Sequence, residues 1–486
     1  LVSAGGTIGV GAASGDMQIT DAELGNITAN NLTIGDSTGG NISISTVTAA
    51  NTNTISGTIT LDASGSGKLI STDNSTSVFE NALTLTANTS ITVAGDLSTN
   101  QGDLNFNGAM IIGEANTPTV STGAGAGDIT VTGAITGTTG GSAETLILLA
   151  GTGAVTLAAV GAGDPTGLVN FTISSSGSAT FGGAVNLPTP GVLAVTSTGD
   201  ITGTAASITV VATSSFTTSG TGTITLTNAS NVFTGGITLS SGTGAVQLTD
   251  SSATILATST LGGNLTVTSS GAITQAGSLT VSGTSSFTST GGDITLTDGS
   301  NDLGANLTLD VNNSFNVVTT STLTDLTLTV SSSSSSTYAL SASNISAFNL
   351  SDTGSNIQIG TLTATALNFG LTVDTDTVTT SGAMSVGTGS LSVTTSEPSG
   401  NGSITISNTL AAGSLTLDAN GQQLDVNINN VVTIASGGAV TLTADDAINF
   451  SSSGSITASG AGNISLQSNT DALAGGSDAI AMTDGS

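Results

Sequence analysis

The chain has 486 residues, of which 31 are acidic and one is basic, so its formal net charge is −30. It contains no His, Cys or Trp, which excludes disulfides, thiolate nucleophiles, zinc sites built on Cys or His, and a Ser-His-Asp triad. The single cation, Lys68, cannot form a phosphate-neutralising surface, so we expect no nucleic acid among its partners.

The composition is uniform along the chain, with Gly, Ser, Thr, Ala and Asn dominating throughout. The length could hold roughly three domains of about 150 residues, but no linker-like break supports that division. The hydrophobic share is 37%, yet Val, Ile and Leu alternate regularly, which a disordered chain would not do. We therefore expect a single continuous β-helical shaft over residues 1–486.

Short alternating segments recur in chain order, each followed by a turn rich in Gly, Ser, Asn or Asp. Examples lie at residues 58–61, 83–86, 129–132, 224–227, 294–297 and 326–330. In each segment the aliphatic side chains fall on one face and the Thr side chains on the other. Helical spacing is not sustained, so the pattern predicts strands.

The spacing of these strands predicts a solenoid. Residues 207–217 resemble residues 278–288, and residues 224–231 resemble residues 294–301, at an offset of about 70 residues. Between residues 432 and 466 the apolar pairs recur about every eight residues, so three edges would give a coil of about 24 residues. We predict an all-β, right-handed parallel β-helix with roughly 20–24 coils of about 20–24 residues.

Gly-Asp pairs mark the corners of this predicted helix. Their acids are Asp16, Asp36, Asp96, Asp103, Asp128, Asp164, Asp200 and Asp293. Gly supplies a positive φ, and we expect each Asp to accept a hydrogen bond from the local backbone while staying in solvent. The six serines Ser331–Ser336 interrupt the pattern and predict a loop or protrusion at residues 331–337.

Three strings carry a resemblance to a known family: residues 265–274, residues 291–298 and residues 437–443. In this repeated pattern of short alternating strands and Gly-rich turns, which covers most of the chain, the sequence resembles filamentous haemagglutinin-type exoproteins and related large bacterial surface adhesins. The resemblance implies a β-helical shaft, secretion across the outer membrane, and a role in adhesion or in a matrix. The family's Asn-rich N-terminal secretion module has no counterpart here.

Carboxylates are the main candidates for chemistry. Asp445-Asp446 is the tightest acidic pair, and β-helical enzymes that degrade polysaccharides use carboxylates. The chain has no Trp and one Tyr to stack on sugar rings. We therefore interpret both as solvated turn residues, expect no enzyme and assign no catalytic residue.

Calcium is the next candidate, because Asp298–Asp302 places oxygen ligands in one turn and Asp293 lies nearby. The Gly-Gly-x-Gly-x-Asp rhythm of calcium-binding nonapeptides is absent, and residues 123–128 are a lone echo of it. We expect no metal or cofactor site, and weak Ca²⁺ binding at most.

Thr, Asn and Phe complete the candidates. Thr-x-Thr pairs could form an ice-binding array, but they lie on irregular coils, and Thr is a favoured solvent-facing strand residue. We expect some Asn to stack between coils and the Phe side chains to fill the core. Asn-x-Ser/Thr sequences occur at Asn26, Asn31, Asn41, Asn74, Asn88, Asn170, Asn228, Asn264, Asn306, Asn312, Asn344, Asn349, Asn401, Asn449 and Asn463.

The sequence thus predicts an extracellular or cell-surface structural protein that forms a rod or filament. Its expected partner is a second copy, stacked head to tail through exposed strand edges. A host or cell-surface glycan bound by an adhesin shaft is the first alternative, and a polysaccharide-degrading β-helical enzyme is the second. The first residues carry no secretion signal and the densest apolar run, 146–150, is too short for a membrane span, so we expect no membrane insertion.

Overall fold

The computed structural model describes residues 1, 5–138, 144–161, 167–323, 325–330, 336–341, 344–345, 348–352, 356–363, 369–373, 377–380, 382–395, 402–419, 423–460, 462–468 and 479–482. The fold is all-β and 2% helical, with parallel sheets stacked as a β-solenoid. The chain divides into two compact units, Leu1–Ile255 and Leu256–Ser486. The predicted fold class is confirmed, whereas a single continuous shaft and its handedness stay predictions.

In unit 1, successive strands along the chain build three stacks, called faces 1, 2 and 3. Face 1 contains β3 (Leu32–Gly35), β5 (Ile59–Ala63), β8 (Leu83–Ala87), β11 (Leu104–Asn107), β14 (Ile129–Val131), β17 (Ala154–Leu157), β19 (Ser178–Phe181), β22 (Ile201–Thr202), β25 (Ile224–Leu226) and β28 (Val246–Asp250). Face 2 contains β2 (Met17–Ile19), β1 (Ile8–Gly11), β4 (Ile42–Ser45), β6 (Leu69–Thr72), β9 (Ser90–Val93), β12 (Met110–Ile112), β15 (Ile135–Thr136), β20 (Val185–Leu187), β23 (Ile208–Val210) and β26 (Val232–Phe233). Face 3 contains β7 (Ser77–Phe79), β10 (Leu97–Thr99), β13 (Thr119–Ser121), β16 (Glu144–Leu149), β18 (Leu168–Ser175), β21 (Val192–Ser197), β24 (Ser214–Thr218) and β27 (Gly236–Ser241).

Unit 2 is built in the same way, after β29 (Thr254–Leu256) at the boundary. Its first strands are β30 (Ser259–Leu261), β31 (Leu265–Ser269), β32 (Ile273–Gln275), β33 (Leu279–Val281), β34 (Ser285–Ser289), β35 (Ile294–Leu296), β36 (Asn306–Val311), β37 (Phe315–Val318), β38 (Thr322–Leu323), β39 (Asp325–Val330), β40 (Ser336–Ser341), β41 (Asn344–Ile345), β42 (Phe348–Asp352) and β43 (Asn356–Thr363). Its later strands are β44 (Phe369–Val373), β45 (Thr377–Thr380), β46 (Met384–Ser385), β47 (Ser390–Thr395), β48 (Gly402–Ile406), β49 (Leu410–Ala412), β50 (Ser414–Ala419), β51 (Leu424–Ile428), β52 (Val431–Ile434), β53 (Val440–Ala444), β54 (Ala447–Phe450), β55 (Ser455–Ala458), β56 (Ile464–Ser468) and β57 (Ala479–Met482).

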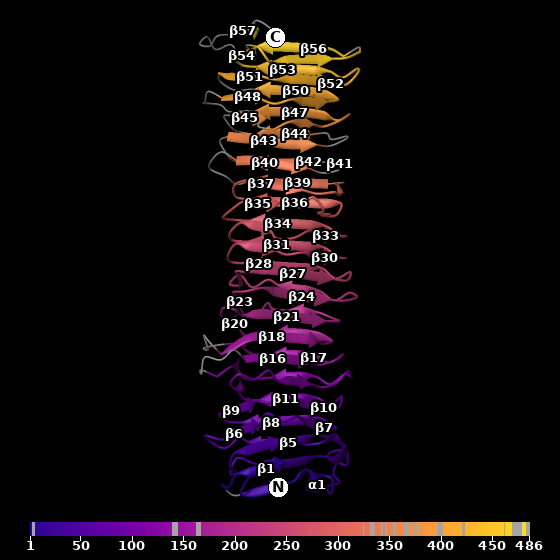
Figure 1. Ribbon diagram of the computed structural model, residues 1–486. Helices are drawn as coiled ribbons and strands as arrows, with labels where there is room; N and C mark the ends of the chain where they lie inside the picture. Colours follow the sequence, from indigo (N-terminus) through magenta and orange to yellow (C-terminus); the bar gives the residue numbers. More distant parts are fainter. Residues whose placement is uncertain are drawn as a thin grey trace. The chain divides into compact units, whose positions relative to one another are not determined.

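The alternating pattern places aliphatic residues inside each coil. On face 1, Ile59 pairs with Leu83 and Leu83 pairs with Leu104, and all three are buried. Figure 1 shows β5, β8 and β11 as successive layers of unit 1. Since each coil covers the apolar row of the one before it, burial depends on repetition. The core role expected for Phe is confirmed at Phe216, which is fully buried and packs edge-to-face on Phe233 at 6.1 Å.

Coil length varies more than the sequence predicted. The step between paired residues of successive coils ranges from 19 residues, from Leu307 to Leu326, to 34 residues, from Ile8 to Ile42. The strands stay short while the corners absorb insertions, which explains the wider range. In the part of the chain that the structure describes, the solenoid makes about 16 turns, fewer than the expected 20–24 coils.

Two short helices were not expected. The helix α1 (Asp21–Leu24) begins after Thr20, and η1 (Ala49–Asn51) is a single 3₁₀ turn. The Thr20 and Glu23 side chains each accept the other's backbone N–H, which is a capping box. Of the predicted loop at 331–337, residues 331–335 lie outside the described residues, and Ser336 and Thr337 begin β40.

Candidate functional site

A row of outward hydroxyl and amide side chains runs along face 1 of unit 1. This threonine row consists of Thr33, Thr60, Thr84, Asn105, Thr130, Thr156, Thr180, Thr202, Thr225 and Gln247, which pair in register from strand to strand. Neighbouring members are therefore about 4.8 Å apart, the spacing of paired strands. The interpretation of these Thr as scattered over irregular coils is wrong for this face, because the irregularity is confined to the corners.

The Gly-Asp corners join one coil to the next. Asp103 Oδ1 accepts the N–H of Asp128 at 3.0 Å, and Asp128 Oδ1 accepts the N–H of Ala154 at 2.7 Å. The same inter-coil bond occurs at Asp96 with Thr119, Asp200 with Thr223, and Asp293 with Ser314. The expected local bond is found at Asp36, which accepts the N–H of Thr38. Most of these acids thus stabilise stacking, and Asp164 lies outside the described residues.

Two buried asparagines link three coils each. Asn231 is 0% exposed, and its Oδ1 accepts the N–H of Ile208 at 2.8 Å. Its Nδ2 donates to the carbonyls of Leu226 at 3.1 Å and Thr249 at 3.2 Å. The amide therefore satisfies main-chain groups in its own coil and in both neighbouring coils, as a buried polar group requires.

Asn301 repeats this arrangement within unit 2. It is also 0% exposed, accepts the N–H of Leu279 at 2.9 Å, and donates to the carbonyls of Leu296 and Val318. The two asparagines occupy corresponding places in the 70-residue sequence echo. The sequence echo therefore corresponds to a structural repeat, although no pattern around these asparagines indicates that they are buried.

The stacking expected for Asn is found on other strands as well. Asn449 Nδ2 donates to Asn427 Oδ1 at 2.9 Å, and Asn427 Nδ2 donates to Thr405 Oγ1 at 3.3 Å. These three residues lie in register on β54, β51 and β48. The side-chain ladder runs between coils and adds to the main-chain ladder beside it.

The acidic pair singled out in the sequence is less solvated than predicted. Asp445 is 5% exposed, and Asp446 Oδ1 is buried with no hydrogen-bond partner. Burial, with the nearby charge of Asp445, raises the pKa of Asp418, and burial raises the pKa of Asp425, to which the charge of Asp446 also contributes. The prediction of a solvated turn residue is wrong for Asp445, because the backbone N–H groups of this turn bond the carbonyls of Ala419 and Leu424 in the neighbouring coil.

The candidate calcium ligands each hydrogen-bond to a different part of the chain. Asp298 Oδ1 accepts the N–H of Ser300, whereas Asp302 Oδ1 accepts the Ser321 hydroxyl at 2.6 Å. Asp293 bonds Asn313 and Ser314. Across the described parts of the chain, no group of three or more Asp or Glu is arranged to hold a metal ion. In residues 123–128, the single segment similar to the nonapeptide motif, Asp128 accepts a hydrogen bond from the N–H of Ala154.

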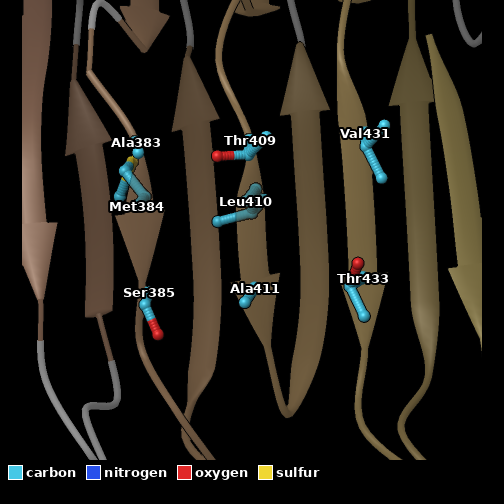
Figure 2. Close-up of a pocket in the computed structure, with 8 residues that line it drawn as sticks. All are labelled: Ala383, Met384, Ser385, Thr409, Leu410, Ala411, Val431 and Thr433. Atoms are coloured by element: carbon cyan, nitrogen blue, oxygen red, sulfur yellow. The ribbon is translucent and has the colours of Figure 1, made fainter.

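A shallow groove of about 280 Å³ crosses three neighbouring strands of unit 2. Figure 2 shows its lining, which consists of Ala383, Met384, Ser385, Thr409, Leu410, Ala411, Val431 and Thr433. Ser385, Ala411 and Thr433 are register partners on β46, β49 and β52. The lining contains hydroxyl groups and apolar side chains but no charged side chain.

Among the described residues, no helix has the length and apolarity needed to cross a membrane. Residues 167–240 and 243–310 match a family described as repeats of unknown function (DUF5649). Each matched segment contains one of the two buried asparagines, Asn231 and Asn301. No match was found among curated proteins or among solved structures. The chain is thus a β-solenoid repeat protein.

Proposed function

We propose that this chain is a non-enzymatic structural part of an extracellular or cell-surface fibre. The observation that carries the proposal is the repetition of one coil design, with apolar residues inside, hydroxyls outside and acidic corners bonded to the next coil. In the described residues these polar groups serve neighbouring coils and do not converge on a reaction centre. Stability that comes from neighbouring repeats is typical of structural solenoids.

Composition supports the extracellular location. The single Lys and the absence of Arg leave few sites for trypsin-like proteases, and the net charge of −30 opposes binding to nucleic acids and anionic membranes. The resemblance of residues 291–298 and 437–443 to filamentous haemagglutinin-type exoproteins supports a bacterial surface or matrix role. The proposed function involves no metal or cofactor. It does involve self-association of copies of the chain through their coil ends.

Cellular location tests the proposal directly. Antibodies against the folded chain should label intact, unpermeabilised cells that produce it, and permeabilisation should add little signal. A cytoplasmic protein labelled in parallel controls for leakage, since it should appear only after permeabilisation. Label confined to permeabilised cells would contradict the proposed location.

The threonine row favours a second candidate, an adhesin shaft that binds a neutral glycan. Its hydroxyls repeat at about 4.8 Å and form an uncharged strip suited to hydrogen-bonding a linear polysaccharide. A glycan panel should then show binding that is lost when Thr130, Thr156 and Thr180 are changed together to Val. The matched control replaces Thr92 and Thr209 of face 2 by Val and should retain binding. A panel without binding would remove this candidate.

A further inference from the structure

The Asn-x-Ser/Thr sequences differ in how far the fold uses their asparagines. This sequence is the acceptor motif of N-linked glycosylation, which adds a bulky sugar to a surface loop. A glycosyltransferase needs the side-chain amide nitrogen exposed and free of hydrogen bonds, because that nitrogen forms the bond to the sugar. The structure can therefore separate usable sequences from chance matches in a chain rich in Asn, Ser and Thr.

Eight of these asparagines have side chains that already bond to other parts of the fold. Asn31 Oδ1 accepts the N–H of Thr58 at 2.9 Å, and Asn88 Oδ1 accepts the N–H of Gly67 at 3.1 Å. The other six are Asn26, Asn41, Asn170, Asn228, Asn264 and Asn449. Turning such an amide toward an enzyme would break a bond that stabilises a turn or the stacking of coils.

Asn74 is different. It is exposed and lies in the corner at residues 73–76, between β6 and β7. Thr76, which supplies the hydroxyl of the motif, is exposed as well. Within the described part of the chain, neither the Asn74 amide nor the Thr76 hydroxyl makes a hydrogen bond. Both groups that define the motif are therefore accessible in the folded chain.

The residues around Asn74 hold the corner in this shape. Asp73 Oδ1 accepts the N–H of Ser75 at 3.0 Å and also accepts its hydroxyl. Ser75 Oγ in turn accepts the N–H of Thr46, in the preceding coil, at 3.0 Å. The following coil places Gly95 against the corner, where a Cβ would lie 2.3 Å from the Ser75 carbonyl oxygen. Since Gly95 has no side chain, the following coil leaves Asn74 exposed.

The exposed Asn-x-Ser sequence at Asn312, in unit 2, is less suited. Asn313 Nδ2 donates to Asp293 Oδ1 at 2.7 Å, and the N–H of Ser314 donates to the same oxygen at 3.0 Å. Ser314, which supplies the hydroxyl of this motif, is half-buried. The middle and last residues of the motif are thus tied to the neighbouring coil, unlike Thr76 beside Asn74.

We propose that Asn74 is an acceptor for N-linked glycosylation by a transferase that uses a sugar activated by phosphate at its anomeric carbon. Asn74 Nδ2 forms a bond to the anomeric carbon, and the bond from that carbon to the phosphate oxygen breaks. The phosphate group leaves with the bonding electrons, and the amide proton passes to a base of the transferase. The attached sugar lies at the corner between faces 2 and 3, so it leaves the threonine row of face 1 uncovered.

Peptide mapping of the full chain tests this assignment. The chain isolated from the cells that produce it should carry a sugar on the peptic peptide that contains Asn74. Unmodified folded chain, incubated with a soluble asparagine glycosyltransferase and UDP-glucose, should gain one hexose at Asn74. This reaction should be at least about fivefold faster than at Asn31, whose bond to Thr58 must first break.

Matched controls separate the fold from the local sequence. Short synthetic peptides around Asn31 and Asn74, which both have Thr at the third position of the motif, should be modified at similar rates. Asn74→Gln and Thr76→Ala should each abolish modification of the Asn74 peptide, and Thr76→Ser should retain it. Asn31→Gln should leave modification at Asn74 unchanged. An unchanged far-ultraviolet circular dichroism spectrum shows that each variant is folded.

Three results would overturn the assignment. They are chain from the producing cells without sugar at Asn74, equal rates at Asn74 and Asn31 in the folded chain, and modification that persists in Thr76→Ala. The inference goes beyond the proposed function and does not depend on it. Surface labelling tests location separately, so either proposal can fail while the other stands.

Discussion

The buried asparagines predict a large local loss of stability when one is removed. In Asn231→Ala, the N–H of Ile208 loses its acceptor, and the carbonyls of Leu226 and Thr249 each lose a donor. An unsatisfied buried polar group costs about 1–3 kcal/mol. Relaxation and water entry recover part of this, so we expect a cost of about 2–5 kcal/mol.

Hydrogen exchange measured on peptic peptides is the appropriate assay, because coils of a solenoid open locally. Peptides that contain the Ile208 amide should exchange at least about 30-fold faster in Asn231→Ala, since each 1.4 kcal/mol is tenfold. The matched control is Ser230→Ala, an exposed neighbour in the same turn, which should change exchange less than about twofold. Asn301→Ala should produce the same effect at Leu279 in unit 2.

Equal protection of Ile208 in the parent chain and in Asn231→Ala would refute this reasoning. It would mean that the amide bonds seen in the structure contribute no stability. An equally large effect of Ser230→Ala would also refute it, because the loss would then follow from any change in the turn.

Three further predictions concern two strand carboxylates, a helix cap and a glycine at a turn. The raised pKa values of Asp418 and Asp425 mean that the folded state holds their protons more tightly, so their stabilising contribution is present at low pH and is lost as pH rises through the folded pKa values. Changing Asp418 and Asp425 together to Asn should therefore raise the urea midpoint of unit 2 at pH 7 and should have less effect near about pH 4. A larger effect at about pH 4 than at pH 7 would contradict this prediction. Thr20→Ala removes the N-terminal cap of α1 and should lower the local stability of this helix by about 1 kcal/mol, measured by hydrogen exchange of its amides. An unchanged exchange rate in α1 would show that the cap does not stabilise the helix. Gly304→Ala forces φ near +78° on a residue whose Cβ would lie 1.9 Å from the Gly283 carbonyl oxygen, and should cost at least about 1–3 kcal/mol by chemical denaturation. Gly299→Ala, with no heavy atom within 4 Å, should be tolerated, and equal costs would contradict the steric argument.

The fold was predictable because strand alternation is a local signal. Segments such as residues 59–61 and 83–85 show which side chains face inward without any knowledge of their partners. Coil length was harder to predict, because corner insertions leave the strands intact and are not visible as a change of pattern. The helix α1 could have been found from Thr20 and Glu23, whose spacing is that of a capping box.

The candidate sites were less predictable, because they depend on register between distant residues. The threonine row needs each of its members to lie outward at the same height, which single segments do not specify. The burial of Asn231 and Asp445 depends on the neighbouring coils above and below. A polar residue in a turn is normally exposed, so the sequence pattern pointed away from both.

Paired cysteines test the parallel stacking of the strands in the stated register most directly. Thr130 and Thr156 are register partners on β14 and β17, and Thr180 lies one coil further along face 1. Neighbouring strands are about 4.8 Å apart, within the range of a disulfide, whereas two coils are about 9.6 Å apart and beyond it. Since the chain has no other Cys, the double change Thr130→Cys with Thr156→Cys should oxidise readily to an intramolecular disulfide, and Thr130→Cys with Thr180→Cys should not. No disulfide in the first pair, or equal yields in both, would contradict the solenoid register.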